Sequence, residues 1–223
     1  MKKLLIGILL LSQTTLFGQS IEKQMKVALK IHDNATTFEE ELKSAQSLAA
    51  ISDANQDMWL PAYWASFVYS QAGNATQSDK LKYFNTAFEY YQRAESQKEK
   101  LTQEEKGHLM ALKALLSSLL QTPYFIQGNS EKGMEYVSMQ VDAFKEGLTY
   151  APAQPTMLVL LGISQIGAGF RSQPDNDLMK IAAGKALLLQ AKSMYEKMEA
   201  GDELVPDRWN QGWIDFWLSR ANQ

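Results

Sequence analysis

Apolar residues recur at the three- and four-residue spacing of amphipathic helices along most of the chain. Strong helix formers such as Ala, Leu, Met, Glu, Gln and Lys dominate these segments. Alternating Val, Ile and Thr runs are few, and no Asn-Gly or Asp-Gly hairpin turn occurs. The sequence therefore predicts an all-α protein with helices over residues 20–33, 37–51, 57–72, 79–99, 103–121, 131–150, 156–169, 177–200 and 207–220.

Polar residues mark several of the expected helix ends. Thr37 precedes Glu40 and Thr102 precedes Glu105 at the spacing of capping boxes, in which the hydroxyl and the carboxylate each bind a free backbone N–H. Glycines followed by a polar residue are typical of helix ends, and we expect stops at Gly73, Gly128 and Gly201.

A spacing of four and then three residues recurs in alternate predicted helices, centred on residues 42, 91, 144 and 195. The centres are 49, 53 and 51 residues apart. The intervening helices place a small residue beside a large one, as at Trp64-Ala65 and Leu161-Gly162. Since one hairpin cannot bury its apolar face alone, the pattern predicts stacked antiparallel helical hairpins.

This repeat resembles the tetratricopeptide repeat (TPR) family. Residues 158–162 (LVLLG) are similar to the family's first-helix motif, with Leu in place of Trp, and residues 87–94 (AFEYYQRA) resemble its second-helix motif. Phe144, Gly147 and Leu148, followed by Pro152, resemble the family's second helix and the proline that follows it. The resemblance covers about residues 37–220, with a period near 50 instead of about 34. It implies a short right-handed α-solenoid.

The resemblance also implies a binding surface for a protein or peptide partner, because the family binds peptides along the concave face formed by first helices. Carried over to this sequence, that face would present, from two units, Trp59, Ala62, Ser66, Tyr69, Thr156, Val159, Ile163 and Ile166.

The predicted links within hairpins, residues 73–78, 122–129 and 170–176, are longer than the family's turn and should emerge on one edge. Pro123 and Gly128 are expected to keep Tyr124, Phe125 and Ile126 out of a helix. These three bulky residues either plug a gap between hairpins or form one wall of a partner site.

The first residues have the layout of a secretory signal peptide. Lys2 and Lys3 precede an apolar run over residues 4–11 that is too short to span a bilayer. We expect cleavage after Gly18, which leaves one domain over residues 19–223 and no membrane span; an uncleaved anchor is the alternative. A bacterial periplasm is the simplest destination, and the chain has no cysteine.

Charge and candidate catalytic residues exclude some classes of function and leave others open. The formal net charge of −3 disfavours nucleic acid. His32 and His108 lack metal-ligand spacing, and the acidic clusters at residues 39–41 and 104–105 suit helix starts. We therefore expect no metal, no cofactor and no catalysis. The favoured function is a periplasmic interaction scaffold. The alternatives are a binding protein for a small apolar or sugar-like ligand, which would use the aromatic-rich helices, and an enzyme whose site the sequence does not reveal.

Overall fold

The computed structural model describes residues 20–76, 78–172, 176–198, 204, 206 and 210–222. These residues form helices and no strand, which confirms the all-α prediction. A short 3-10 helix at Lys98–Lys100 accompanies the α-helices, which are α2 (Ile21–Asp33), α3 (Phe38–Ala54), α4 (Trp59–Ala75), α5 (Lys80–Glu95), α6 (Gln103–Ile126), α7 (Ser130–Tyr150), α8 (Pro155–Phe170), α9 (Leu178–Lys197) and α10 (Trp213–Arg220). The predicted signal segment, residues 1–18, lies outside the described residues.

The two predicted capping boxes are confirmed. Thr37 Oγ1 accepts from the Glu40 amide at 3.3 Å, and the Glu40 carboxylate accepts from the Thr37 amide at 3.2 Å. Thr102 and Glu105 make the same pair of bonds at 3.3 and 2.8 Å. These bonds satisfy amides that the first turn leaves without an intrahelical partner, so they fix where α3 and α6 begin.

The predicted helix ends are correct in part. Gly128, with φ of +77°, follows the last residues of α6 in the left-handed conformation that suits glycine. Gly73 instead lies inside α4, where a Cβ would meet the Phe84 ring of α5 at 2.5 Å, so its role is close helix approach. The predicted stop at Gly201 lies outside the described residues.

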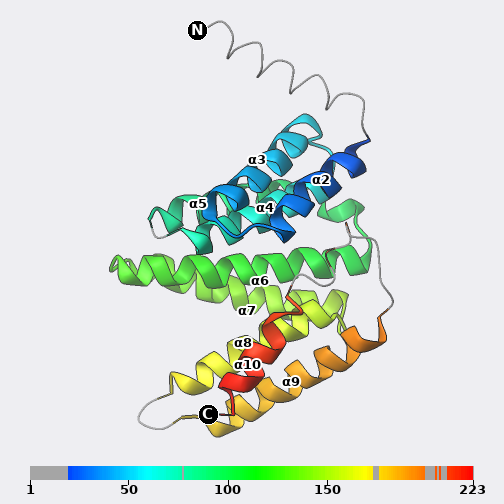
Figure 1. Ribbon diagram of the computed structural model, residues 1–223. Coiled ribbons are helices and arrows are strands. Elements are labelled where there is room, and N and C mark those ends of the chain that lie inside the picture. The colour runs from blue at the N-terminus through cyan, green and yellow to red at the C-terminus, as the bar shows by residue number, and fades with distance from the viewer. Residues whose placement is uncertain are drawn as a thin grey trace, which may run out of the picture.

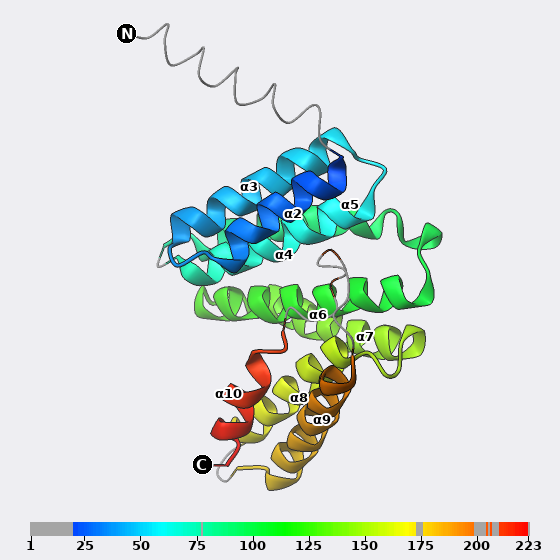
Figure 2. The same cartoon turned by 45° about the vertical axis from the view of Figure 1, so that its right-hand side comes forward.

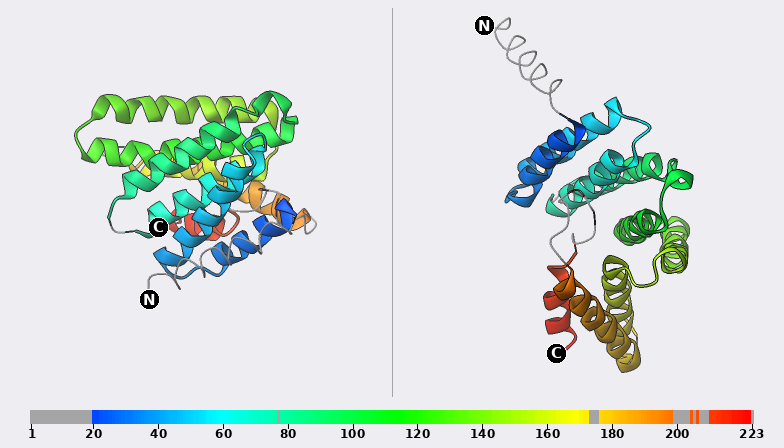
Figure 3. Two further views of the ribbon diagram at one scale, coloured as in Figure 1. Left: turned by 90° about the horizontal axis from the view of Figure 1, so that it is seen from above. Right: turned by 90° about the vertical axis from the view of Figure 1, so that its right-hand side faces the viewer.

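Consecutive helices pack beside one another in chain order, most extensively α4 on α5, α6 on α7 and α8 on α9 (Figure 1). The first helices of these pairs also contact each other, α4 against α6 and α6 against α8. Seen from the side, α2 to α9 follow an arc, and α10 lies toward its open side (Figure 3). The carboxyl ends of α4, α6 and α8 lie at one edge, on the left of Figure 1.

The repeated aromatic positions lie in the core. Tyr91 of α5 is fully buried together with Ala87 and Ala94, and Tyr195 of α9 is 2% exposed. The Tyr91 hydroxyl donates to Glu95 at 2.5 Å, and Lys113 of α6 pairs with the same carboxylate at 3.0 Å. Tyr91 and Tyr195 therefore fill space in the core. Through Glu95, the Tyr91 hydroxyl is also linked to Lys113, so that α5 is connected to α6 of the next helix pair.

A close helix crossing lies between α8 and α9, where Gly162 faces Gly184. A Cβ added at Gly162 would lie 2.9 Å from the Gly184 carbonyl oxygen, and one added at Gly184 would lie 2.6 Å from the Gly162 carbonyl oxygen. Both obstacles are backbone atoms, which cannot turn away as a side chain can. The small residue in the first-helix motif thus sets how near the two helices lie.

We predict that Gly162→Ala lowers the free energy of unfolding by about 1–3 kcal/mol, because the helices must separate to admit the methyl group. The matched control is Gly167→Ala in the same helix, where the three atoms nearest to an added Cβ belong to the flexible Arg171 guanidinium, the nearest at 3.2 Å. This control should be neutral or stabilising by up to about 1 kcal/mol. Urea unfolding of both variants is the measurement, and equal effects would contradict the crossing.

Candidate functional site: the first-helix face and the C-terminal segment

Four residues predicted to line an open groove are instead fully buried, with no exposed side-chain surface: Ala62 and Ser66 of α4, and Thr156 and Val159 of α8. Ile166 is buried as well. The prediction is wrong for these positions because α4 packs between α3 and α5, and α8 is covered by α9 and α10. They belong to the core and cannot touch a partner on this folded chain.

Three other predicted groove residues are half-buried. Trp59 packs edge-to-face on Tyr63 with ring centroids 5.6 Å apart, and Tyr69 stacks on Tyr90 of α5 at 5.7 Å. Ile163 packs against the apolar cluster between α8, α9 and α10. These side chains keep some surface in contact with solvent, so they remain candidates for partner contact.

The Tyr124–Ile126 stretch is helical, and the prediction of a loop there is wrong. Pro123 lies inside α6, and the final turn is closed by bonds from Gln127 N to the Pro123 carbonyl and from Asn129 N to the Tyr124 carbonyl, at 3.0 and 2.9 Å. The link to α7 is therefore only residues 127–129. Packing of Tyr124 and Phe125 against α7 offsets the cost of proline near a helix end.

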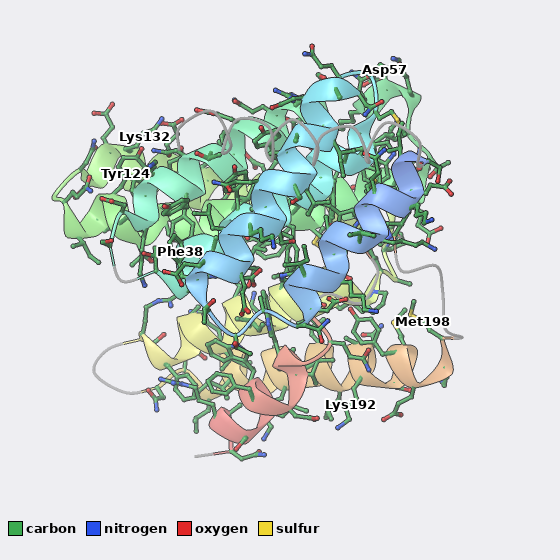
Figure 4. The ribbon with its side chains drawn as sticks, turned by 45° about the horizontal axis from the view of Figure 1, so that its top comes forward. Phe38, Asp57, Tyr124, Lys132, Lys192 and Met198 are labelled. Atoms are coloured by element: carbon green, nitrogen blue, oxygen red, sulfur yellow. The ribbon has the colours of Figure 1, made fainter. Side chains whose placement is uncertain are left out.

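The three bulky residues of this turn have different surroundings. Tyr124 stacks on Tyr136 of α7 at 5.6 Å and belongs to the cluster of Phe84, Leu120 and Tyr136. It lies at the α6–α7 end of the molecule, as does Lys132 (Figure 4). Phe125 is 40% exposed and Ile126 is 81% exposed. Tyr124 therefore fills a gap between helices, while Ile126 projects into solvent.

A site that the sequence analysis missed lies where the C-terminal segment crosses the first helices. We define this segment as residues 204–222, of which 204, 206 and 210–222 are described. Trp64 Nε1 of α4 donates to the Leu204 carbonyl at 2.9 Å, across 140 residues of sequence. The His108 ring of α6 binds the backbone of Pro206, which has a carbonyl but no N–H to offer.

The third contact is made by Asn210, which is fully buried. Its carboxamide nitrogen donates to the Thr156 carbonyl of α8 at 2.9 Å, and its oxygen accepts from the Tyr195 hydroxyl of α9 at 2.8 Å. The Thr156 and Tyr195 hydroxyls are themselves 3.1 Å apart. Each first helix thus contributes one residue that contacts the segment: Trp64 contacts Leu204, His108 contacts Pro206, and Thr156 contacts Asn210.

Beyond Asn210 the chain continues into α10, which lies against α8 and α9 (Figure 2). Ile214 is 2% exposed and packs in the apolar cluster between α8, α9 and α10. The predicted last helix, residues 207–220, was too long at its start: residues 210–212 form turns, and residues 207–209 lie outside the described residues. Asn210 lies between Trp209 and Gln211 in a largely polar stretch, so the sequence carried no clear signal that its side chain is buried and hydrogen-bonded.

His108 is the titratable group at the centre of this site. Burial lowers the pKa of its imidazole from 6.5 to about 4, although Glu105 and the Pro206 carbonyl both favour the protonated form. The Gln154 carboxamide lies beside the same ring, 2.7 Å from His108 Nδ1 and 3.1 Å from the Gly107 carbonyl oxygen. His108 is therefore neutral near pH 7 and is used for hydrogen bonding.

The remaining groups with possible chemistry have structural partners. His32 Nδ1 lies 2.7 Å from the Glu41 carboxylate, and its ring packs on Phe67. Over the part of the chain that the structure describes, no three His, Cys, Asp or Glu side chains are grouped so that they could hold a metal ion. The acidic residues at 39–41 and 104–105 lie in first helical turns, where the helix dipole favours negative charge.

Among the described residues, α6 is the one helix long and apolar enough to cross a membrane, judged by length and composition. Half of its most apolar window is buried against neighbouring helices, as in a core helix of a folded domain. Comparison with protein-family models, curated proteins and solved structures gives no match to this chain. The geometry of the site is therefore the basis for the functional proposal.

We predict that stability falls as the pH decreases from about 6.5 toward 4, because the unfolded chain protonates His108 more readily than the folded chain does. The folded-state pKa is depressed, so this contribution is complete above pH 6.5 and is lost on acidification. Its upper limit is about 3 kcal/mol.

Carboxylates elsewhere also titrate in this range, so the comparison is with His108→Gln, which keeps a polar side chain without a titrating ring. Urea unfolding at several pH values should give a flatter dependence for the variant. Parallel curves for the two proteins would contradict the assignment of His108.

Proposed function

We propose that this protein is an exported, non-catalytic interaction scaffold that binds a protein or peptide partner on the face of its first helices. The observation that carries the proposal is that three successive first helices, α4, α6 and α8, each contact one described residue of the C-terminal segment: Leu204, Pro206 and Asn210. Two of the three points are main-chain carbonyls, which any peptide presents.

The proposal includes a TPR-like α-solenoid of right-handed stacked hairpins. It is supported by the packing of α4 on α5, α6 on α7 and α8 on α9, and by the arc these pairs follow (Figure 3). The motif positions at Ala87, Tyr91 and Gly162 lie at buried helix contacts, as the TPR pattern requires. An arc of this kind presents an extended concave surface, which suits a peptide.

The surroundings of the aromatic side chains favour a scaffold over a binding protein for a small ligand. Tyr63, Trp64 and Phe67 are at most 6% exposed and pack on one another edge-to-face. The aromatic-rich helix α4 is thus used mainly for core packing. The half-exposed Trp59, Tyr69 and Ile163, and the exposed Phe125, are the proposed partner contacts.

Export to a periplasm is part of the proposal and rests on Lys2, Lys3 and the apolar run that follows them. We predict that the mature protein begins at Gln19. Mass spectrometry of the amino-terminal peptide from an envelope fraction is the measurement. A mature chain that keeps Met1 would show that the segment is not removed.

We predict that a photo-crosslinking residue at position 59 or 163 captures one discrete partner in intact cells, because Trp59 and Ile163 are half-buried residues of the first helices α4 and α8. The matched control is the same residue at Asp142, a 69% exposed position on α7, a second helix. Products are read by gel shift and mass spectrometry. A discrete product at 142 and none at 59 or 163 would contradict the proposed surface.

A further inference from the structure

We propose that the C-terminal segment is a built-in occupant of the partner-binding face, and that a partner binds by displacing it. This inference rests on the proposed function of the first-helix face. The partner would be a peptide segment of matching chemistry: an apolar side chain in place of Leu204, main-chain carbonyls for Trp64 and His108, and a carboxamide in place of Asn210.

The contacts of the segment define this chemistry. Leu204 is 4% exposed and belongs to the main apolar core, so the face includes a place for an aliphatic side chain. Trp64 and His108 supply donors, and the carbonyl acceptors they meet belong to the backbone. Asn210 is recognised through polar side-chain atoms, as both donor and acceptor, and it is the described residue of the segment that is fully buried while doing so. Such a face would discriminate weakly between peptide sequences where it binds backbone carbonyls, and strongly at the position that corresponds to Asn210.

We expect the helices α2 to α9 to stay folded when the segment is released. Most buried residues of the apolar clusters belong to these helices, the segment adds Leu204 and Ile214 to them, and α10 is only eight residues long. Two polar contacts at and after α10 are exposed: Lys192 pairs with Asp215 of α10 at 2.7 Å, and Lys185 donates to Asn222, which follows the helix. Exposed pairs of this kind stabilise weakly. Among the described residues of the segment, Leu204, Pro206, Asn210 and Ile214 are buried.

Covalent attachment makes the segment a strong competitor. A tethered segment binds its own chain at a high effective concentration, so the face is open in only a small fraction of molecules. The apparent affinity for a free peptide is reduced by that fraction. Weakening the tethered segment, without changing the face, must therefore increase the apparent affinity for the same peptide.

The experiment uses the full mature chain and, as the probe, a fluorescently labelled synthetic peptide with the sequence of residues 199–223. Asn210→Ala and Leu204→Ala alter the tethered segment while the peptide keeps both native residues. Gln211→Ala is the matched control, because Gln211 is adjacent to Asn210 and exposed. Fluorescence anisotropy gives the dissociation constants.

We expect the peptide to bind Asn210→Ala and Leu204→Ala at least about tenfold more tightly than the wild type, with Gln211→Ala equal to the wild type. Equal binding by all four proteins, or no binding by any, would overturn the inference. Failure here leaves the crosslinking result at positions 59 and 163 intact, so the two proposals can fail separately.

Hydrogen exchange of the wild type gives a second reading that does not depend on the folding of a variant. If the segment opens by itself, amides of residues 210–214 exchange at least about tenfold faster than the core amides of α6. If both sets exchange together, only through global unfolding, the segment is a fixed part of the fold and the inference is wrong.

Discussion

The hydrogen bond from the Trp64 indole to the Leu204 carbonyl joins the α4–α5 pair to the C-terminal segment, which provides partners for polar groups on the inner side of the first helices. Helices α4, α6 and α8 are each packed against a partner helix on one side, and their inward side chains include polar groups. A buried indole N–H, imidazole or peptide carbonyl without a partner is costly. The segment supplies these partners and so completes the inner face of the arc.

On the side away from the segment, each first helix is held in place by its packing against a second helix. Gly162 and Gly184 allow the backbones of α8 and α9 to approach closely. Tyr91 of α5 and Tyr195 of α9 are buried and fill space in the core. The first helices are thereby held in fixed relative positions. Three points that recognise one segment then come from three different helices without any of them being on a mobile loop.

Local chemistry made the helices predictable. The capping boxes at Thr37 and Thr102 and the left-handed Gly128 act within a few residues, so their sequence signals correspond directly to structure. The positions of Ala62, Ser66 and Thr156 were misjudged because a single helix pattern does not say how many neighbours cover it. In α4, apolar residues on all sides were the better guide, since such a helix is buried.

The contact between Trp64 and Leu204 could not be predicted, because it joins residues far apart in the chain and involves a backbone carbonyl that every residue carries. The most direct test of the account is amide and indole hydrogen exchange by NMR, with the Trp64 Nε1–H signal assigned through Trp64→Phe. The account predicts exchange slowed at least about a hundredfold relative to the unfolded chain, and faster exchange in Asn210→Ala while the α6 amides stay protected. Exchange of the Trp64 indole at the unfolded rate in the wild type would contradict it.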